Sequence, residues 1–215
     1  MTEELEQGTE AWRLARCGSL GASSLGDALA KTKSGWGASR ANVLARLAIE
    51  RLTGTPQDTY QNQAMRDGVE REPTARAAYQ FERGVLVKQV GLIKHPTITG
   101  THASPDGLVA ADGMIEIKAP SAATHLETLL GAPIPQKYQY QCAWQMGCTG
   151  RKWVDFTSYH PDFPEAMQLH ITRVHRNDQL ISELEAQVRE FLAELEAKLA
   201  ALTSRYGVSS QQEAA

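Results

Sequence analysis

The segment 104–118 constrains the fold more than any other part of the chain, because its turn residues indicate a hairpin of two short strands. It reads Ser-Pro-Asp-Gly-Leu-Val-Ala-Ala-Asp-Gly-Met-Ile-Glu-Ile-Lys. The pair Asp112-Gly113 is typical of a tight turn between strands. The sequence therefore predicts strands near 99–109 and 114–119, paired side by side.

This hairpin brings together residues with a shared chemistry. Glu116 and Lys118 are two residues apart on the second strand and point to the same face, and Asp106 comes from the neighbouring strand. Two carboxylates and an ammonium so placed suit a hard divalent cation such as Mg²⁺. The backbone carbonyl of Ile117 offers one more oxygen ligand. The pattern indicates metal-dependent phosphodiester hydrolysis, in which Lys118 orients or deprotonates the attacking water or neutralises developing charge.

Composition leaves this function open and excludes others. The chain has 215 residues, 42% of them hydrophobic, and a formal net charge of −3, which argues against coating of nucleic acid by a wholly basic surface. No apolar run is long enough for a membrane span and no signal peptide opens the chain. Three cysteines, at 17, 142 and 148, include no C-x-x-C pair and are expected to be buried thiols of a cytosolic protein.

Helical and strand patterns alternate along the chain. We expect helices over 23–30, 39–52, 136–147 and 178–203, and strands over 84–95, 153–159 and 168–175. The segment 63–82 is rich in helix-forming residues, and Pro73 within it should start a helix or kink one. Asp178 is the expected N-cap of the last helix. The order predicts an α/β or α+β fold with a central mixed β-sheet flanked by helices. One domain is expected over 1–206, followed by a disordered tail at 207–215.

A third carboxylate lies upstream of the hairpin, in Gly68-x-x-x-Glu72. A helical Glu72 is a candidate for completing the metal shell, but Glu70 is a local competitor, and Pro73 makes the backbone there hard to predict. A solvated helical glutamate is the alternative reading of either residue.

A neutral amide on the 136–147 helix is a further candidate. Gln141 shares a helical face with Lys137 and Gln145. An amide beside a water held by the metal ion can position that water by one hydrogen bond. Solvent exposure of Gln141 is the plainer alternative.

Near the N-terminus, Ser23 and Ser24 precede an apolar helical run, and Ser24 with Asp27 has capping-box spacing. Unpaired amide groups at such a helix start attract anions. Arg16, the Ser23 hydroxyl and Lys33 are candidates for a phosphate pocket, with Lys31 as the alternative to Lys33.

Taken together and in order, these motifs resemble the phage lambda exonuclease family, the YqaJ-type alkaline exonucleases within the PD-(D/E)xK nuclease superfamily. The motifs are Glu-Gln-Gly-x-x-Ala-Trp at 6–12, Arg16-x-Gly18, Ala22-Ser23, Gly68-x-x-x-Glu72, Ser104-Pro105-Asp106-Gly107-Leu108, Glu116-x-Lys118-x-Pro120 and Gln139-x-Gln141. The resemblance runs from about residue 6 to beyond residue 190. It implies a restriction-endonuclease-like core.

The resemblance also implies an activity and its machinery. Family members are Mg²⁺-dependent exonucleases that digest one strand of linear double-stranded DNA from 5′ to 3′ and leave a 3′ overhang for recombination. They form ring-shaped homotrimers and work with a single-strand annealing protein in the cytoplasm of a phage-carrying bacterium. Two ions per site are expected, with Mn²⁺ as a substitute.

Carried over by motif, the site residues take named roles. Asp106, Glu116, the Ile117 carbonyl and Glu72 would hold metal; Lys118 and Gln141 would act on the water; and Arg16, Ser23 and Lys33 would hold the 5′-phosphate.

Other functions remain open from sequence. A restriction or junction-resolving endonuclease of the same superfamily would share the metal site without needing a terminal phosphate. A non-catalytic DNA-end-binding module would tolerate loss of Asp106, Glu116 or Lys118, yet all three are present. An iron–sulfur nuclease needs four cysteines, and the chain has three.

Overall fold

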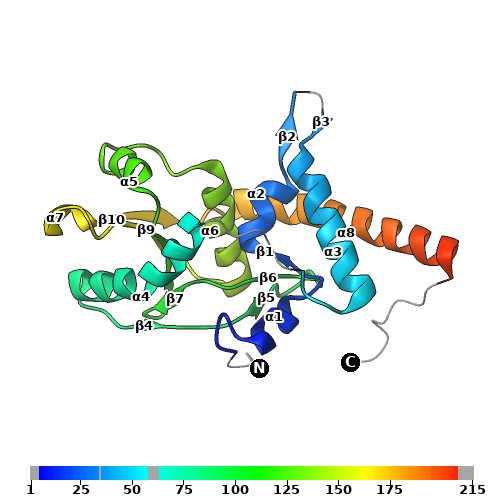
Figure 1. Cartoon of the computed structure of the whole chain (residues 1–215), viewed down its shortest axis with the longest axis horizontal. Helices are drawn as coiled ribbons and strands as arrows, with labels where there is room; N and C mark the ends of the chain where they lie inside the picture. Colours follow the sequence, from blue (N-terminus) through cyan, green and yellow to red (C-terminus); the bar gives the residue numbers. More distant parts are fainter. Residues whose placement is uncertain (1–4, 34, 58–62, 208–215) are drawn as a thin grey trace.

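The computed structural model describes residues 5–33, 35–57 and 63–207. Helices pack around two sheets, and a separate pair of strands projects from the body (Figure 1). The helical elements are α1 (Glu10–Arg16), the 3₁₀ turn η1 (Ala22–Ser24), α2 (Leu25–Ala28), α3 (Ala38–Thr53), α4 (Gln63–Arg83), α5 (Ala122–Leu129), α6 (Gln136–Thr149), α7 (Glu165–Gln168) and α8 (Asp178–Tyr206). The tail predicted at 207–215 lies outside the described residues apart from Gly207, which follows α8 in a left-handed conformation.

A mixed sheet of five strands carries the predicted hairpin. Its order is β10 (Leu169–His175), β9 (Trp153–Tyr159), β8 (Gly113–Lys118), β7 (Gly107–Val109) and β4 (Val87–Lys88). β7 and β8 pair antiparallel with Gly107 opposite Ile115, whereas β8 and β9 run parallel. The mixed α+β class and the hairpin are confirmed. Because β8 lies between β9 and β7, its backbone is paired on both sides, which fixes the direction of its side chains.

A second sheet divides two strands that the sequence predicted as continuous. β5 (Ile93–Lys94) and β6 (Thr101–Ala103) pair with each other, and β6 also pairs parallel with β1 (Leu20–Gly21). The predicted strand 99–109 is therefore β6 and β7, separated at 104–106, where Pro105 has no N–H to donate to a ladder. The predicted strand 84–95 is likewise β4 and β5.

The helices enclose one large core and one smaller one. The larger core joins α3, α6 and α8 through apolar side chains such as Leu47, Trp144 and Phe191. Buried residues recur along α8 as its periodicity predicted, and α8 packs on α3 and α6 of the same chain. The smaller core lies between α4 and the five-stranded sheet around Tyr79 and Ile115.

Three local expectations need correction. The N-cap of α8 is Asn177, whose side chain accepts from Leu180 N at 3.0 Å, and Asp178 is the first helical residue. α4 confirms the helical segment predicted over 63–82, but of the start or kink expected at Pro73 the start is wrong, because the helix runs through this residue. Pro73 leaves one carbonyl of the preceding turn without its helical donor. The predicted helix 23–30 is only η1 followed by α2.

A third pair of strands forms a projecting hairpin. β2 (Lys31–Thr32) and β3 (Gly35–Trp36) extend from the body at the top of Figure 1, just before α3. Among the residues described, no helix has both the length and the apolar character needed to cross a membrane. The three cysteines are free, and two of them, Cys142 and Cys148, are buried.

Candidate active site

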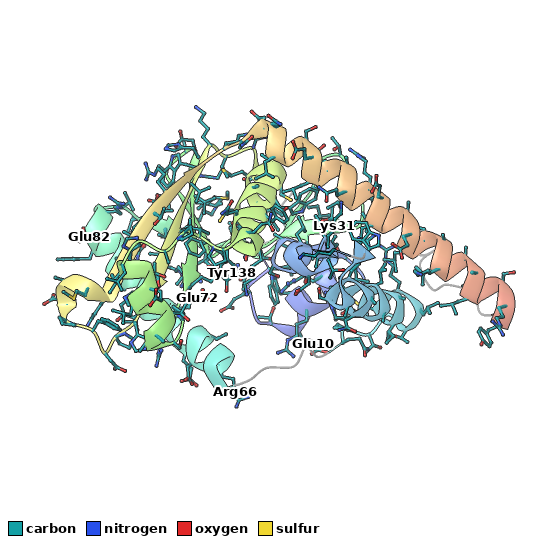
Figure 2. The ribbon with its side chains drawn as sticks, turned by 90° about the horizontal axis from the view of Figure 1, so that it is seen from above. Glu10, Lys31, Arg66, Glu72, Glu82 and Tyr138 are labelled. Carbon is teal, nitrogen blue, oxygen red and sulfur yellow. The ribbon has the colours of Figure 1, made fainter. Side chains whose placement is uncertain are left out.

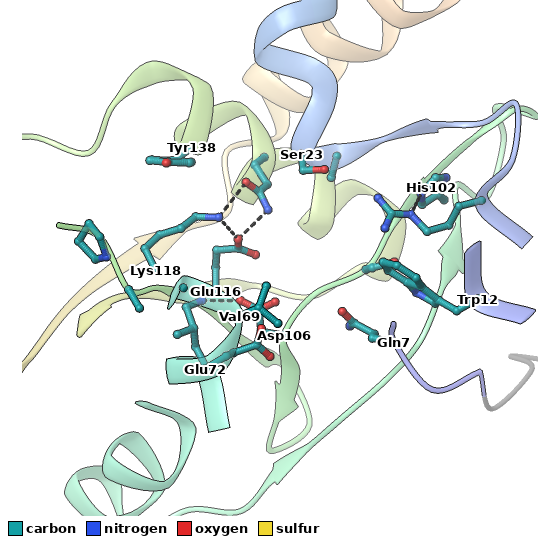
Figure 3. A pocket seen from close by; sticks show the side chains of 18 residues that line it. Gln7, Trp12, Ser23, Val69, Glu72, His102, Asp106, Glu116, Lys118 and Tyr138 are labelled. Atoms are coloured by element: carbon teal, nitrogen blue, oxygen red, sulfur yellow. Dashed lines mark hydrogen bonds and ion pairs between the residues drawn. The ribbon is translucent and has the colours of Figure 1, made fainter. Parts of the chain in front are cut away.

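A cavity of about 460 Å³ opens where the two sheets meet, and the predicted motifs converge on it (Figure 3). Its walls come from segments far apart in sequence. The predicted site residues that line it are Arg16, Ser23, Glu72, Asp106, Glu116, Ile117, Lys118 and Gln141. The break between β6 and β7 places Asp106 at its floor, and β8, α4 and α6 supply most of the rest.

Glu116 and Lys118 share one face of β8, as their spacing predicted. Lys118 Nζ lies 2.6 Å from Glu116 Oε1. Gln141 on α6 donates from Nε2 to the same oxygen at 2.6 Å, and its own Oε1 lies 3.5 Å from Lys118 Nζ. The three side chains form a closed hydrogen-bonded group at the centre of the cavity (Figure 3).

Asp106 reaches the same group through the backbone. Its Oδ2 accepts from the N–H of Ile117 at 2.6 Å. Because Ile117 lies between Glu116 and Lys118, this bond holds the carboxylate of Asp106 against the middle of the Glu-x-Lys motif.

Asp106, Glu116 and Glu72 lie close enough in the cavity for their carboxylates to repel one another. Burial, followed by the charges of Glu116 and Glu72, raises the pKa of Asp106 well above its usual value. Burial also raises the pKa of Glu72, with Arg76 opposing the shift and Glu116 adding to it. A divalent cation would relieve this repulsion.

Lys118 is held as an ammonium. Burial opposes its charge, but the carboxylates of Glu116 and Asp106 outweigh burial and raise the pKa of Lys118 above its usual value. In this arrangement the side chain suits orientation of a water molecule and neutralisation of charge. Proton abstraction would first require loss of its own proton.

The oxygen donors of the cavity suit a hard cation, although they do not form a complete coordination site. Asp106, Glu116 and Glu72 supply carboxylate oxygens, the chemistry that Mg²⁺ prefers. Within the described part of the chain, no three acidic, histidine or cysteine side chains are drawn together tightly enough to form a complete metal site.

The structure distinguishes the two upstream glutamates. Glu72 lines the cavity and pairs with Arg76 one turn later on α4, whereas Glu70 is exposed and does not line it. Seen from above, Lys31 lies apart from Glu72 and Tyr138, which both line the cavity (Figure 2).

Arg16 lies at the other end of the cavity, where two side chains hold its guanidinium. Its guanidinium stacks on the Trp12 ring at 4.0 Å, and its Nε donates to His102 Nε2 at 3.1 Å. Burial and the nearby Arg46 lower the pKa of Arg16 to about 10, so it stays charged at neutral pH. A fixed guanidinium fork facing a cavity is suited to a phosphate group.

His102 serves this arrangement as a neutral ring. Burial, with Arg16 and Arg46, lowers the pKa of His102 to about 3. Its Nε2 therefore accepts from Arg16, and Nδ1 faces Ser19 Oγ at 2.8 Å as a donor.

The rest of the predicted phosphate pocket is only partly assembled. Ser23 lines the cavity, but Ser24 makes no capping bond and instead accepts from Arg46 Nη2 at 3.2 Å. Lys33 and Lys31 both lie on the projecting hairpin and line no part of this cavity, so neither is brought to Arg16. Sequence spacing placed them nearby because it could not show that the hairpin projects.

Comparison with known proteins identifies the family of this chain. Residues 11–152 match the YqaJ-like viral recombinase domain. The chain belongs to the YqaJ-like viral recombinase family. No curated protein matches the sequence significantly.

Solved structures extend the YqaJ-like match to the whole fold. An alkaline exonuclease (LHK-Exo) from Laribacter hongkongensis is 47% identical, with a TM-score of 0.86 over 93% of this chain and 98% of that one. Its complex with dAMP matches with a TM-score of 0.87 at the same identity and coverage. A phage related exonuclease from Haemophilus somnus 129PT shares the fold, with a TM-score of 0.70 at 14% identity, over 86% of this chain and 96% of that one.

The YqaJ-like site also contains residues that the sequence did not assign. His102 lies four residues before Asp106 and gives no signal until β6 places it beside Arg16. Tyr138 faces Lys118, whose Nζ lies 4.7 Å from the ring centre. Gln145 was noted only as sharing a face with Gln141, and that i, i+4 spacing was the available signal for its contact with Glu116.

Proposed function

We propose that this protein is a Mg²⁺-dependent 5′-to-3′ exonuclease that degrades one strand of linear double-stranded DNA and leaves a 3′ overhang. The observation that carries the proposal is a single cavity in which a carboxylate–lysine group lies opposite a fixed arginine fork. The 47% identical relative is an alkaline exonuclease and has been captured with dAMP, a deoxynucleoside monophosphate.

The two ends of the cavity suit two parts of one substrate. Arg16, with Ser23 beside it, would receive a terminal 5′-phosphate by charge-assisted hydrogen bonds. The phosphodiester that follows would then lie toward Asp106, Glu116 and Lys118. An enzyme that anchors the terminal phosphate acts from DNA ends and has a fixed polarity.

The chain's own groups divide the chemical work. Asp106, Glu116, the Ile117 carbonyl and Glu72 would hold Mg²⁺, or Mn²⁺ in its place, as two ions. When bound, the metal polarises the phosphodiester and lowers the pKa of the attacking water. Lys118 neutralises charge on the phosphate, and Gln141, fixed on Glu116, orients the water by its amide.

The biological setting belongs to the same proposal. The YqaJ-like viral recombinase domain supports a role in phage-type recombination. A single-strand annealing protein is the partner that the family resemblance implies. A homotrimeric ring in the cytoplasm of a bacterial host is the assembly that the family resemblance implies, and mass measurement by light scattering tests it.

Digestion of one plasmid tests the proposal. Closed-circular and linearised 5′-phosphorylated forms are incubated with Mg²⁺, and strand loss is followed from each labelled end. Loss of the linear form alone, starting at 5′ ends, is the expected result. Cutting of the closed circle would instead indicate an endonuclease, and tight end binding without cutting would indicate a non-catalytic module.

A further inference from the structure

Gln145 is a polar residue in an apolar place. It lies on α6 one turn after Gln141 and is fully buried, with the buried apolar residues Trp144 and Met146 beside it in the sequence. Its Oε1 is buried and has no hydrogen-bond partner within the described residues. A buried amide with an unpaired acceptor costs stability, so an apolar residue of the same size would suit packing better.

The Nε2 group of Gln145 explains why a glutamine occupies this position. Gln145 Nε2 donates to Glu116 Oε2 at 2.6 Å. Lys118 and Gln141 both contact the opposite oxygen, Oε1. In the part of the chain described here, Gln145 is the one residue that donates to Oε2.

A carboxylate held at one oxygen can still turn. The terminal torsion of a glutamate is broad, so donors on Oε1 alone leave the plane of the Glu116 carboxylate free to rotate. Two amides on successive turns of α6, each on a different oxygen, fix that plane. Because Oε1 already accepts from Lys118 and Gln141, the open lone pair is on Oε2, and fixing the plane aims it in one direction.

We propose that Gln145 is a positioning residue that fixes the Glu116 carboxylate for a divalent cation. The inference rests on the proposed function, because it assumes that Glu116 is a metal ligand. Mutating a residue that hydrogen-bonds to a metal ligand and orients it typically lowers metal affinity or activity by about 10- to 100-fold.

The test compares three full-length proteins by calorimetric titration with Mn²⁺ in the absence of DNA. They are the wild type, Gln145→Met and Met146→Leu. Gln145→Met keeps the side-chain volume and removes both the donor and the unpaired acceptor. Met146→Leu is a volume-conserving change at a buried position on the same helix, outside the cavity.

Gln145→Met is expected to bind Mn²⁺ about 10- to 100-fold more weakly, with Met146→Leu equal to wild type. Digestion of linear DNA by Gln145→Met should be slow at limiting Mn²⁺ and recover at saturating Mn²⁺, because the defect lies in affinity. A merely structural defect would not be recovered by metal. Gln145→Asn, whose shorter amide cannot reach Oε2, provides a second variant with the same expectation.

If folded Gln145→Met or folded Gln145→Asn bound Mn²⁺ with wild-type affinity, the proposed role of Gln145 would be overturned, and the proposed exonuclease function would be unaffected. A wild-type protein that neither binds Mn²⁺ nor digests linear DNA would overturn the proposed function and this inference with it. The two failures are therefore distinguishable.

Discussion

The carboxylate of Asp106 accepts a 2.6 Å hydrogen bond from the backbone N–H of Ile117, so the break between β6 and β7 is tied to the middle of β8. This bond places an acidic side chain beside the Glu116–Lys118 pair without any side-chain donor. It also places Asp106 close to the charges of Glu116 and Glu72. Burial, followed by these two charges, raises the pKa of Asp106.

Asp106→Asn should abolish metal-dependent hydrolysis and stabilise the protein when metal is chelated. Asparagine can still accept from Ile117, and the buried charge is gone. Because the folded-state pKa of Asp106 is raised, wild-type stability falls as pH rises from about 4 toward that pKa. The advantage of Asp106→Asn should therefore grow over the same range. Unfolding in urea with a chelator, from pH 4 to pH 8, measures it; equal stability at every pH would contradict the charge repulsion.

Lys118→Met should reduce the rate of hydrolysis by about 10²- to 10³-fold while DNA binding persists, because the ammonium neutralises charge on the reacting phosphate. Lys137→Met is the matched control. Lys137 also contacts the Tyr138 ring at 4.7 Å but does not line the cavity. Single-turnover digestion and a filter-binding assay separate the two effects. Near-normal turnover of Lys118→Met would exclude the assigned role.

Glu72→Gln should weaken Mg²⁺ binding by at least about tenfold, and Glu70→Gln should leave it unchanged. Both residues lie on α4, but only Glu72 lines the cavity. Magnesium titration of the exonuclease rate compares the pair directly. The same response from both variants would remove Glu72 from the metal site.

Arg16→Ala should reduce the preference for 5′-phosphorylated over 5′-hydroxyl ends by about 10- to 100-fold, the value of one or two hydrogen bonds to a charged group. Arg13→Ala is its control, since Arg13 belongs to the same turn of α1 without lining the cavity. Initial rates on the two kinds of linear end give the preference. An unchanged preference in Arg16→Ala would show that the Arg16 guanidinium does not bind the 5′-phosphate.

Asp155→Ala should cost about 3 kcal/mol of unfolding free energy at neutral pH, because it leaves Arg173 and the Tyr79 hydroxyl without their buried partner. Burial opposes ionisation of Asp155, but hydrogen bonds from Arg173 and Tyr79 outweigh it and hold its pKa below the usual value. This stabilisation is present above about pH 4 and is lost as pH falls through the folded-state pKa. Chemical unfolding of both proteins at pH 7 and pH 3 should show the difference shrinking in acid; a constant difference would argue against an ionic contribution.

Local patterns predicted much of the site. The hairpin, the two-residue spacing of Glu116 and Lys118, and the helical repeat of α8 depend only on neighbours in the chain. The predicted Asp-Gly turn was misplaced, because Gly113 is already paired with Val109 in the hairpin and residues 110–112 make the connection. The breaks at 104–106 and between β4 and β5 were missed, although Pro105 marks the first, because the sheet that each strand joins depends on partners elsewhere in the chain.

The sequence by itself determined the hairpin, the shared face of its acid and lysine, and the mixed α+β class, since these follow from backbone periodicity. Only the tertiary structure decided that Glu72 rather than Glu70 enters the cavity, that Lys33 lies outside it, and that distant residues complete it. His102 is 86 residues from Arg16, and Gln145 is 29 residues from Glu116. Contacts at such separations are set by how whole elements pack, and local periodicity carries no record of that packing.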